Sequence, residues 1–100
     1  MIRFTWDPEK AESNFRKHGV RFKVATKVFD DPSVFTRQDR VVDDELRRQA
    51  IGLVEGTVIL LVAHSYSVEE SDEIIRIISA RRADRTERRI YEEHRILQSG

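Results

Sequence analysis

Two adjacent arginines, Arg81 and Arg82, stand out as residues that could bind a phosphate group. They directly follow the apolar segment Ile74–Ala80, whose isoleucines alternate onto both faces of an extended chain, as in a buried central strand. A guanidinium donates hydrogen bonds in a planar fork that matches phosphate oxygens, so a strand ending in arginines suits that chemistry. The alternative is a solvated pair that forms salt bridges with nearby acids. We expect Arg76, inside the segment, to pair with a carboxylate, because an unpaired buried charge is costly.

Two other places in the sequence combine residue types that move protons or hold anions. His64 lies near the end of the apolar segment Thr57–Tyr66 and could act as a general acid or base, or could only hydrogen-bond at the rim of a sheet. Glu45 and Arg47 precede the strand that contains Ile51 and Gly52, and they could form an acid/base and phosphate-binding pair. The alternative for this pair is an ion pair at a strand end, which contributes little stability.

Basic residues gather toward the end of the chain although its formal net charge is zero. Seven of the eighteen lysines and arginines fall between Arg76 and Arg95, so a neutral protein could still present a basic face to a nucleic acid. Arg85 and Arg88 belong to this group and could equally form a solvated, salt-bridged helix surface. Lys17 could bind nucleic acid, but a cation at a helix C-terminus is also favoured by the helix dipole.

Capping residues mark where the first and last predicted helices begin or end in the sequence. Asp7 and Gly19 bound a first helix, with Asp7 as N-cap and Gly19 as a left-handed terminator. Asp84 and Glu87 have the spacing of a capping box at the start of the last helix, for which we expect an inner stripe of Ala83, Ile90 and Leu97. The remaining elements are a second helix at Val20–Phe29, a loop at Gln38–Glu45, and strands at Ile2–Trp6, Ser33–Arg37, Arg47–Val54, Thr57–Tyr66 and Ile74–Ile78.

These elements predict one domain over residues 1–100, in the order β-α-α-β-β-β-β-α. We expect an α+β fold in which flanking helices pack on a small, mostly antiparallel sheet. The sequence has no cysteine, which excludes disulfides, thiolate metal sites and a cysteine nucleophile. We expect no metal and no cofactor. The longest apolar run, Val58–Ala63, is too short to span a bilayer, and we expect a soluble cytoplasmic protein without membrane contact.

Four segments together resemble the BrnT-type ribonuclease toxins of bacterial type II toxin–antitoxin systems. They read FTWDPEKAESNFRKHGVRF, VFDDP, ELRRQAIG and IIRIISARRADRTERRIYE, in the order and spacing of that family. The resemblance implies a RelE-like fold and RNA cleavage without a metal ion. It also implies neutralisation by an antitoxin of the ribbon-helix-helix type, with DNA contacted only through the toxin–antitoxin complex.

The resemblance gives the candidate residues their expected roles. Arg81 falls in the family's SAR motif, and Glu45 and Arg47 match its acid–x–Arg arrangement. We therefore predict an endoribonuclease; the alternatives are a non-enzymatic module that binds nucleic acid or protein through the same basic rim, and a structural protein whose charged helix docks a partner. A titratable group within reach of the arginines distinguishes the enzyme from the binding module. The expected catalytic residues are Glu45, Arg47, His64 and Arg81, and the expected RNA-binding residues are Lys17, Arg82, Arg85 and Arg88.

Overall fold

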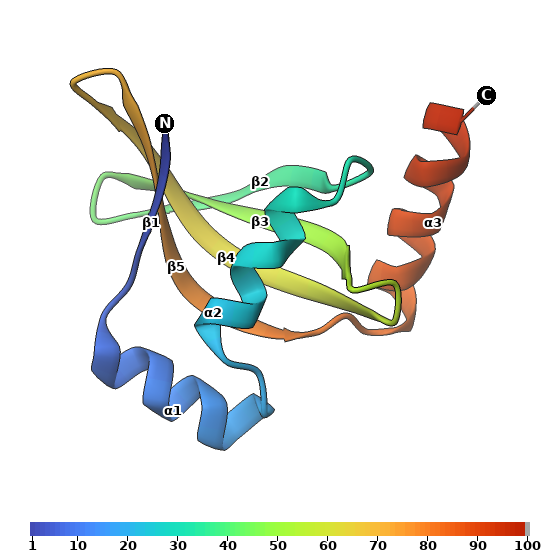
Figure 1. The fold of residues 1–100 in the computed structure, drawn as a ribbon, viewed down its shortest axis with the longest axis horizontal. Helices are drawn as coiled ribbons and strands as arrows, with labels where there is room; N and C mark the ends of the chain where they lie inside the picture. The colour runs from blue at the N-terminus through green and yellow to red at the C-terminus, as the bar shows by residue number, and fades with distance from the viewer. Residues whose placement is uncertain (100) are drawn as a thin grey trace.

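The computed structural model describes residues 1–99 and shows a single sheet with helices on both of its faces (Figure 1). The predicted α+β class and the order of elements are confirmed, except that the second helix is short and continues as a 3-10 helix, η1. The elements are β1 (Ile2–Thr5), α1 (Pro8–His18), α2 (Phe22–Ala25), η1 (Thr26–Asp30), β2 (Phe35–Val42), β3 (Glu45–Val54), β4 (Val58–Glu69), β5 (Asp72–Arg82) and α3 (Arg85–Ser99).

The five strands lie in the order β1-β5-β4-β3-β2. Strands β2 to β5 form antiparallel pairs, whereas β1 pairs with β5 in parallel. The sheet is therefore mixed, and the prediction of a mostly antiparallel sheet was wrong. A parallel pair needs a long connection, and no local turn signal marks the pairing of the first strand with the last.

The predicted loop Gln38–Glu45 was also wrong. Strand β2 continues to Val42, and Asp43 and Asp44 alone make the turn, with φ angles of 50° and 64°. Aspartate is among the residues that tolerate this left-handed region best, which allows a two-residue hairpin turn. As a result, Glu45 is the first residue of β3 and its side chain has a fixed direction on the sheet.

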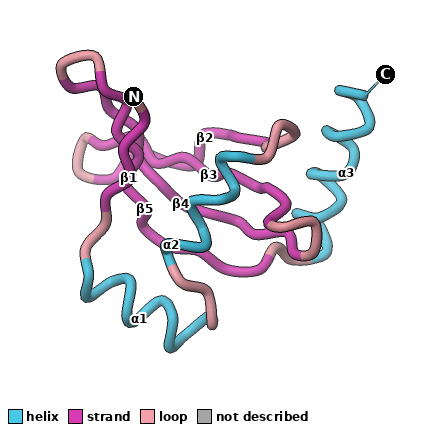
Figure 2. Tube along the Cα trace, in the orientation of Figure 1, coloured by secondary structure: helices cyan, strands magenta, loops and turns pink. Residues whose placement is uncertain are grey.

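The helices divide the sheet into two unequally covered faces. Helices α1, α2 and η1 pack over one face and enclose the main core with residues such as Val62, Ile77 and Ala80. Helix α3 covers only one end of the other face, where Tyr91 packs with Ile51 and Leu61. Figure 2 shows α3 apart from the other helices, at one end of the strands. No other helix among residues 1–99 covers the rest of that second face.

Helix α3 is held by its capping box and by a buried latch. The expected cap is present: Glu87 N–H donates to Asp84 at 2.8 Å, and Asp84 N–H donates to Glu87 at 2.9 Å. Tyr91, which is fully buried, donates its hydroxyl to Asp31 at 2.5 Å. Leu97 is 81% exposed, so the expected inner stripe does not extend to it. Ala83 is buried and Ile90 is half-buried, as expected, and the fully inward positions within α3 are those of Glu87 and Tyr91, four residues apart.

Asp31 ties α3 to the sheet. Its carboxylate also accepts a hydrogen bond from Leu53 N–H at 2.8 Å. Burial raises the pKa of Asp31, but hydrogen bonds led by Tyr91 outweigh that effect and hold the pKa below its usual value. Burial and the bond to Asp31 raise the pKa of Tyr91 to about 12. Gly52 lies beside this latch, and a Cβ there would meet Val28 Cγ1 at 2.8 Å.

Helix α1 is fixed to β5 by one buried side chain. Strand β1 pairs with β5 only as far as Arg76, which leaves the edge of β5 beyond it without a strand neighbour. Asn14 closes this edge, because its side chain accepts from Ala80 N–H at 3.1 Å and donates to Ala80 C=O at 2.9 Å. The backbone immediately before Arg81 is therefore held on both sides, by β4 and by α1.

Candidate active site

Four arginines project from the sheet face that α3 leaves open. Arg37 comes from β2, Arg47 from β3, and Arg76 and Arg81 from β5. We call the surface formed by these four side chains the arginine face. Cross-strand partners share a face, so the register places small side chains between the arginines and keeps that surface shallow. These small residues are Ala63, Ser65 and Ser79.

A bulge in β5 is what brings Arg76 and Arg81 to the same face. Strict alternation would place residues five apart on opposite faces of a strand. The register shifts between Ala63 and His64, which pair with Ser79 and Ile77, so Ile78 is the extra residue. One inserted residue reverses the alternation beyond it. Arg81 therefore emerges on the side that already carries Arg76.

Glu45 accepts hydrogen bonds from two of these arginines. Arg47 Nε donates to Glu45 Oε1 at 3.0 Å, and Arg76 donates to the same oxygen. The prediction that Arg76 pairs with a carboxylate is thus confirmed. Burial raises the pKa of Glu45, but the hydrogen bond and charge of Arg76, followed by those of Arg47, bring the pKa below its usual value. The group is a carboxylate at neutral pH, held between two cations that could also contact a phosphate.

Arg81 is oriented by Glu87 from the first turn of α3. Its two terminal nitrogens donate to the two carboxylate oxygens, each at 2.8 Å. The hydrogen bond from Arg81 lowers the pKa of Glu87, and the same bond raises the pKa of Arg81. Glu87 is 7% exposed and also completes the helix cap, so one carboxylate fixes both the helix start and the guanidinium.

Arg37 and Gln49 lie between these two groups. They are cross-strand neighbours, and Arg37 Nε donates to Gln49 Oε1 at 2.8 Å. Positions two residues apart on one strand are separated by roughly 7 Å. The Arg47 row of the sheet and the Arg81 row therefore lie about 13 Å apart, with Arg37 midway. Positive charges in successive rows can follow the phosphates of an extended chain and can act together on a phosphate that lies between the rows.

His64 does not join the arginine face. It lies on the opposite side of the sheet, 3% exposed, with its ring 4.9 Å from that of Phe29 and Nδ1 3.2 Å from the carbonyl of Val62. Burial lowers the pKa of His64, so the ring is neutral near pH 7. Of the four expected catalytic residues, the structure brings together Glu45, Arg47 and Arg81 on one face and separates His64 from them.

The expected RNA-binding residues are dispersed over the molecule. Lys17 borders a hollow between α1 and β5 that also contacts Ser79, beside the arginine face. Arg82 points to the helix-covered side of the sheet, opposite to Arg81. Arg85 is exposed in the first turn of α3, and Arg88 donates to the carbonyl of Ala83 at 2.9 Å. Of these four residues, Arg82 is thus the one that the structure places on the side opposite to the arginine face.

Sequence reasoning missed Arg37 and Gln49 as site residues. Both lie at alternate positions that share a face with apolar neighbours, Phe35 for Arg37 and Ile51 for Gln49. The face on which each side chain lies could therefore be inferred from the sequence, but the pairing of β2 with β3 was hidden because residues 38–45 were predicted as a loop.

Among residues 1–99, no group of three or more His, Asp or Glu side chains has the arrangement of a metal site. No helix in this range is both long and apolar enough to cross a membrane.

Comparison with known proteins agrees with the resemblance seen in the sequence segments. The family described as "Ribonuclease toxin, BrnT, of type II toxin-antitoxin system" matches residues 6–87. The crystal structure of the Brucella abortus ribonuclease toxin, BrnT, aligns with a TM-score of 0.59 and 26% sequence identity, covering 85% of this chain and 100% of that one. No curated protein matches. The matched residues include the strand that carries Arg76 and Arg81, and the chain belongs to the BrnT family of ribonuclease toxins of type II toxin–antitoxin systems.

Proposed function

We propose that the arginine face cleaves RNA without a metal ion. The observation that carries the proposal is the convergence of Arg47 and Arg76 on Glu45, on the same open surface as the Arg81–Glu87 pair. Cleavage of RNA without a metal needs positive charge where the phosphorane forms, and fixed guanidinium groups supply it. The family name supports RNA as the substrate at the level of the family.

In the proposed reaction, the 2′-oxygen of a ribose attacks the neighbouring phosphorus and its proton passes to Glu45. The bond from phosphorus to the 5′-oxygen breaks, leaving a 2′,3′-cyclic phosphate and a 5′-oxygen that takes a proton from water. The hydroxide that remains takes the proton from Glu45 and restores its carboxylate. Glu45 is ionised near neutral pH and can accept the proton, although its lowered pKa makes it a weak base. Arg47, Arg76 and Arg81 then contribute chiefly by stabilising the charge that develops on the phosphoryl oxygens.

Membership in a type II toxin–antitoxin family implies an antitoxin protein as partner. We infer further that this antitoxin is of the ribbon-helix-helix type, that the toxin reaches DNA only through the complex, and that the fold is RelE-like. The support for these three points is the resemblance of the sequence segments. We also infer that the toxin acts in the cytoplasm, where its proposed RNA substrate is found.

The first experiment incubates the purified chain with bulk RNA in excess EDTA, alongside Arg81→Ala and the control Arg89→Ala. Arg89 is an exposed arginine of α3 that is not one of the four arginines of the arginine face, so the control removes the same charge from a different position. We expect wild type and control to cut and Arg81→Ala to lose cleavage while remaining folded by circular dichroism. Cleavage that disappears in EDTA would contradict metal independence, and full activity of the Arg81 variant would contradict its assigned role. RNA binding without any cleavage would favour the non-enzymatic binding module.

A further inference from the structure

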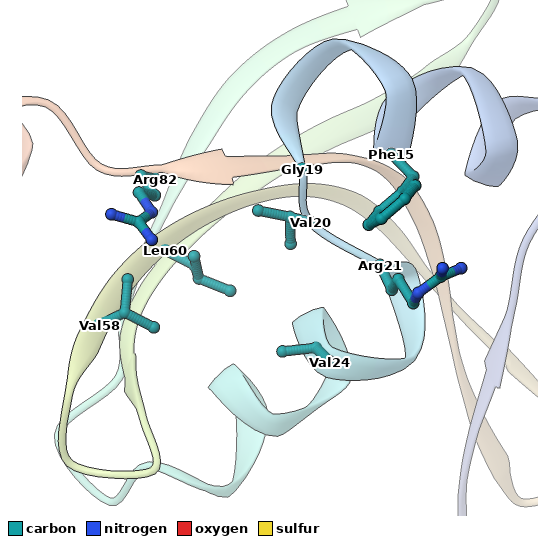
Figure 3. A pocket seen from close by; sticks show the side chains of 8 residues that line it. All are labelled: Phe15, Gly19, Val20, Arg21, Val24, Val58, Leu60 and Arg82. Carbon is teal, nitrogen blue, oxygen red and sulfur yellow. The ribbon is translucent and has the colours of Figure 1, made fainter.

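An apolar groove lies on the side of the sheet opposite to the arginine face. It forms where the connection between α1 and α2 passes over the start of β4, and it encloses about 310 Å³. Phe15, Val20, Val24 and Leu60 are among its lining residues, and Val24 is 38% exposed. Figure 3 shows these apolar side chains between two arginines, Arg21 and Arg82. An apolar floor of this kind suits an apolar side chain better than a phosphate group.

The two arginines make the rim positively charged. Within residues 1–99, neither Arg21 nor Arg82 forms an ion pair, in contrast to Arg47, Arg76 and Arg81 on the other face. Arg21 lies over the ring of Phe15, with its guanidinium carbon 3.9 Å from the ring centroid. This stacking positions the cation in advance at the edge of the apolar floor. A partner that fills the groove and also neutralises its rim would carry carboxylates on both sides of an apolar side chain.

A second hollow extends the same surface. It encloses about 270 Å³, shares Arg21 with the first, and is bordered by Trp6, Ala11 and Phe22. The shared residue makes the two hollows adjoin along the outer side of α1 and α2. A continuous apolar surface interrupted by one cation fits a protein segment with several apolar side chains. RNA fits it poorly, because the ring of Phe15 is already covered by Arg21 and the ring of Trp6 packs edge-on against Phe22.

We propose that this groove is a docking site for the antitoxin, through a segment in which carboxylates flank an apolar side chain. The choice of partner rests on the proposed function, because the family implies one protein partner. Docking here leaves the arginine face uncovered by this segment, and the remainder of the antitoxin can reach it around the end of β5. Arg81 and Arg82 are consecutive residues on opposite faces, so the two surfaces come close together at that strand end.

The test measures the affinity of the purified antitoxin, encoded with this toxin, for two groove variants. Val24→Glu places a carboxylate on the apolar floor, and Arg21→Glu reverses one rim charge. Arg89→Glu, on exposed α3, is the control with the same change of charge as Arg21→Glu. We expect the dissociation constant to rise about tenfold or more for both groove variants, since a like charge opposite a partner carboxylate is unfavourable, and to change less than about twofold for the control.

A cleavage assay of each toxin variant without antitoxin, together with circular dichroism to check its folding, separates the possible outcomes. Unchanged cleavage with weakened antitoxin binding supports the docking site. Unchanged antitoxin affinity in both folded groove variants would overturn it. Lost cleavage in folded groove variants would assign the groove to RNA and also overturn it. Because antitoxin binding is measured directly, a wild-type chain that cuts no RNA would count against the proposed reaction and leave the docking result to stand by itself.

Discussion

Replacing Glu87 by glutamine should separate catalysis from RNA binding. Glu87 accepts hydrogen bonds from both terminal nitrogens of Arg81 and from the backbone N–H of Asp84. Glutamine is also accepted at this position of a capping box, so Glu87→Gln keeps an acceptor for Asp84 and removes the charge. Arg81 then loses the second oxygen that fixes the plane of its guanidinium. Glu87 acts through Arg81 and is thus a positioning residue in the proposed reaction.

The cost in stability follows from the exposure of the pair. The Arg81 side chain is 37% exposed and that of Glu87 10%, so the ion pair lies between a screened surface pair and a buried one. We therefore expect Glu87→Gln to lower the free energy of unfolding by about 1–2 kcal/mol. Glu87→Ala also loses the cap, which adds about 1 kcal/mol. In a domain of this size each kcal/mol lowers Tm by about 4–8 °C.

The kinetic signature is a change of kcat and of RNA affinity in opposite directions. A misplaced guanidinium should lower kcat by about 10–100-fold, because positioning within about 1 Å matters for the transition state. Removing a carboxylate beside Arg81 raises the local positive charge, so an uncleavable 2′-O-methyl RNA should bind Glu87→Gln as tightly as wild type or more tightly. The control is Glu92→Gln, which removes a half-buried carboxylate on the same helix that pairs with Arg95 instead of Arg81.

The reasoning would be refuted if Glu87→Gln lowered cleavage and RNA affinity together, in proportion to the folded fraction. That result would give Glu87 a role in stability alone. Equal kcat values for Glu87→Gln and Glu92→Gln in folded protein would also refute it, because they would show that Arg81 needs no bidentate partner. Assays at a temperature well below the lower Tm keep these outcomes apart from simple unfolding.

Three further predictions concern stability. The free energy of unfolding of the wild type should fall as pH rises from 10 to about 12, because tyrosine in the unfolded chain releases its proton near 10 and folded Tyr91 near 12. Urea denaturation at pH 9 and 11.5 should show a smaller fall for Tyr91→Phe than for the wild type. Wild type should also lose stability as pH falls below 6.5, since unfolded histidine binds a proton that buried His64 resists; His64→Leu should lack this loss yet still cleave RNA per folded molecule. Gly52→Ala should cost about 1–3 kcal/mol in urea denaturation through its clash with Val28, and adding Val28→Ala should recover only part of it, because the Val28 carbonyl also lies 3.1 Å from the new Cβ.

Local signals in the sequence were sufficient wherever the structure is decided by near neighbours. Asp7 caps α1, Gly19 ends it with φ of 70°, and Asp84 and Glu87 form the expected capping box. These features depend on residues at most a few positions apart, so their physics can be evaluated from a short window. The same is true of the opposite directions of Arg81 and Arg82, which follow from alternation alone.

Strand β2 shows where a local signal fails. Its central residues, 38 to 41, are all exposed, so no alternation of apolar and polar side chains marks them as a strand. Their extended conformation is instead imposed by pairing with β3, whose own apolar residues belong to the core. An edge strand of this kind is thus identified only through its neighbour. The consequence for function was that Arg37 and its partner Gln49 were overlooked as site residues.

The composition of the arginine face depends on a feature that no single strand reveals. Alternation along β5 predicts that Arg76 and Arg82 share a face and that Arg81 points away from them. The bulge at Ile78 reverses this relation, so that Arg81 joins Arg76 and Arg82 faces the groove. No residue type in the sequence indicates the bulge, because isoleucine is common in regular strands. It becomes visible only when β4 is paired on both sides of the shift, and the segment from Arg76 to Arg81 therefore contains a backbone irregularity as well as two charges.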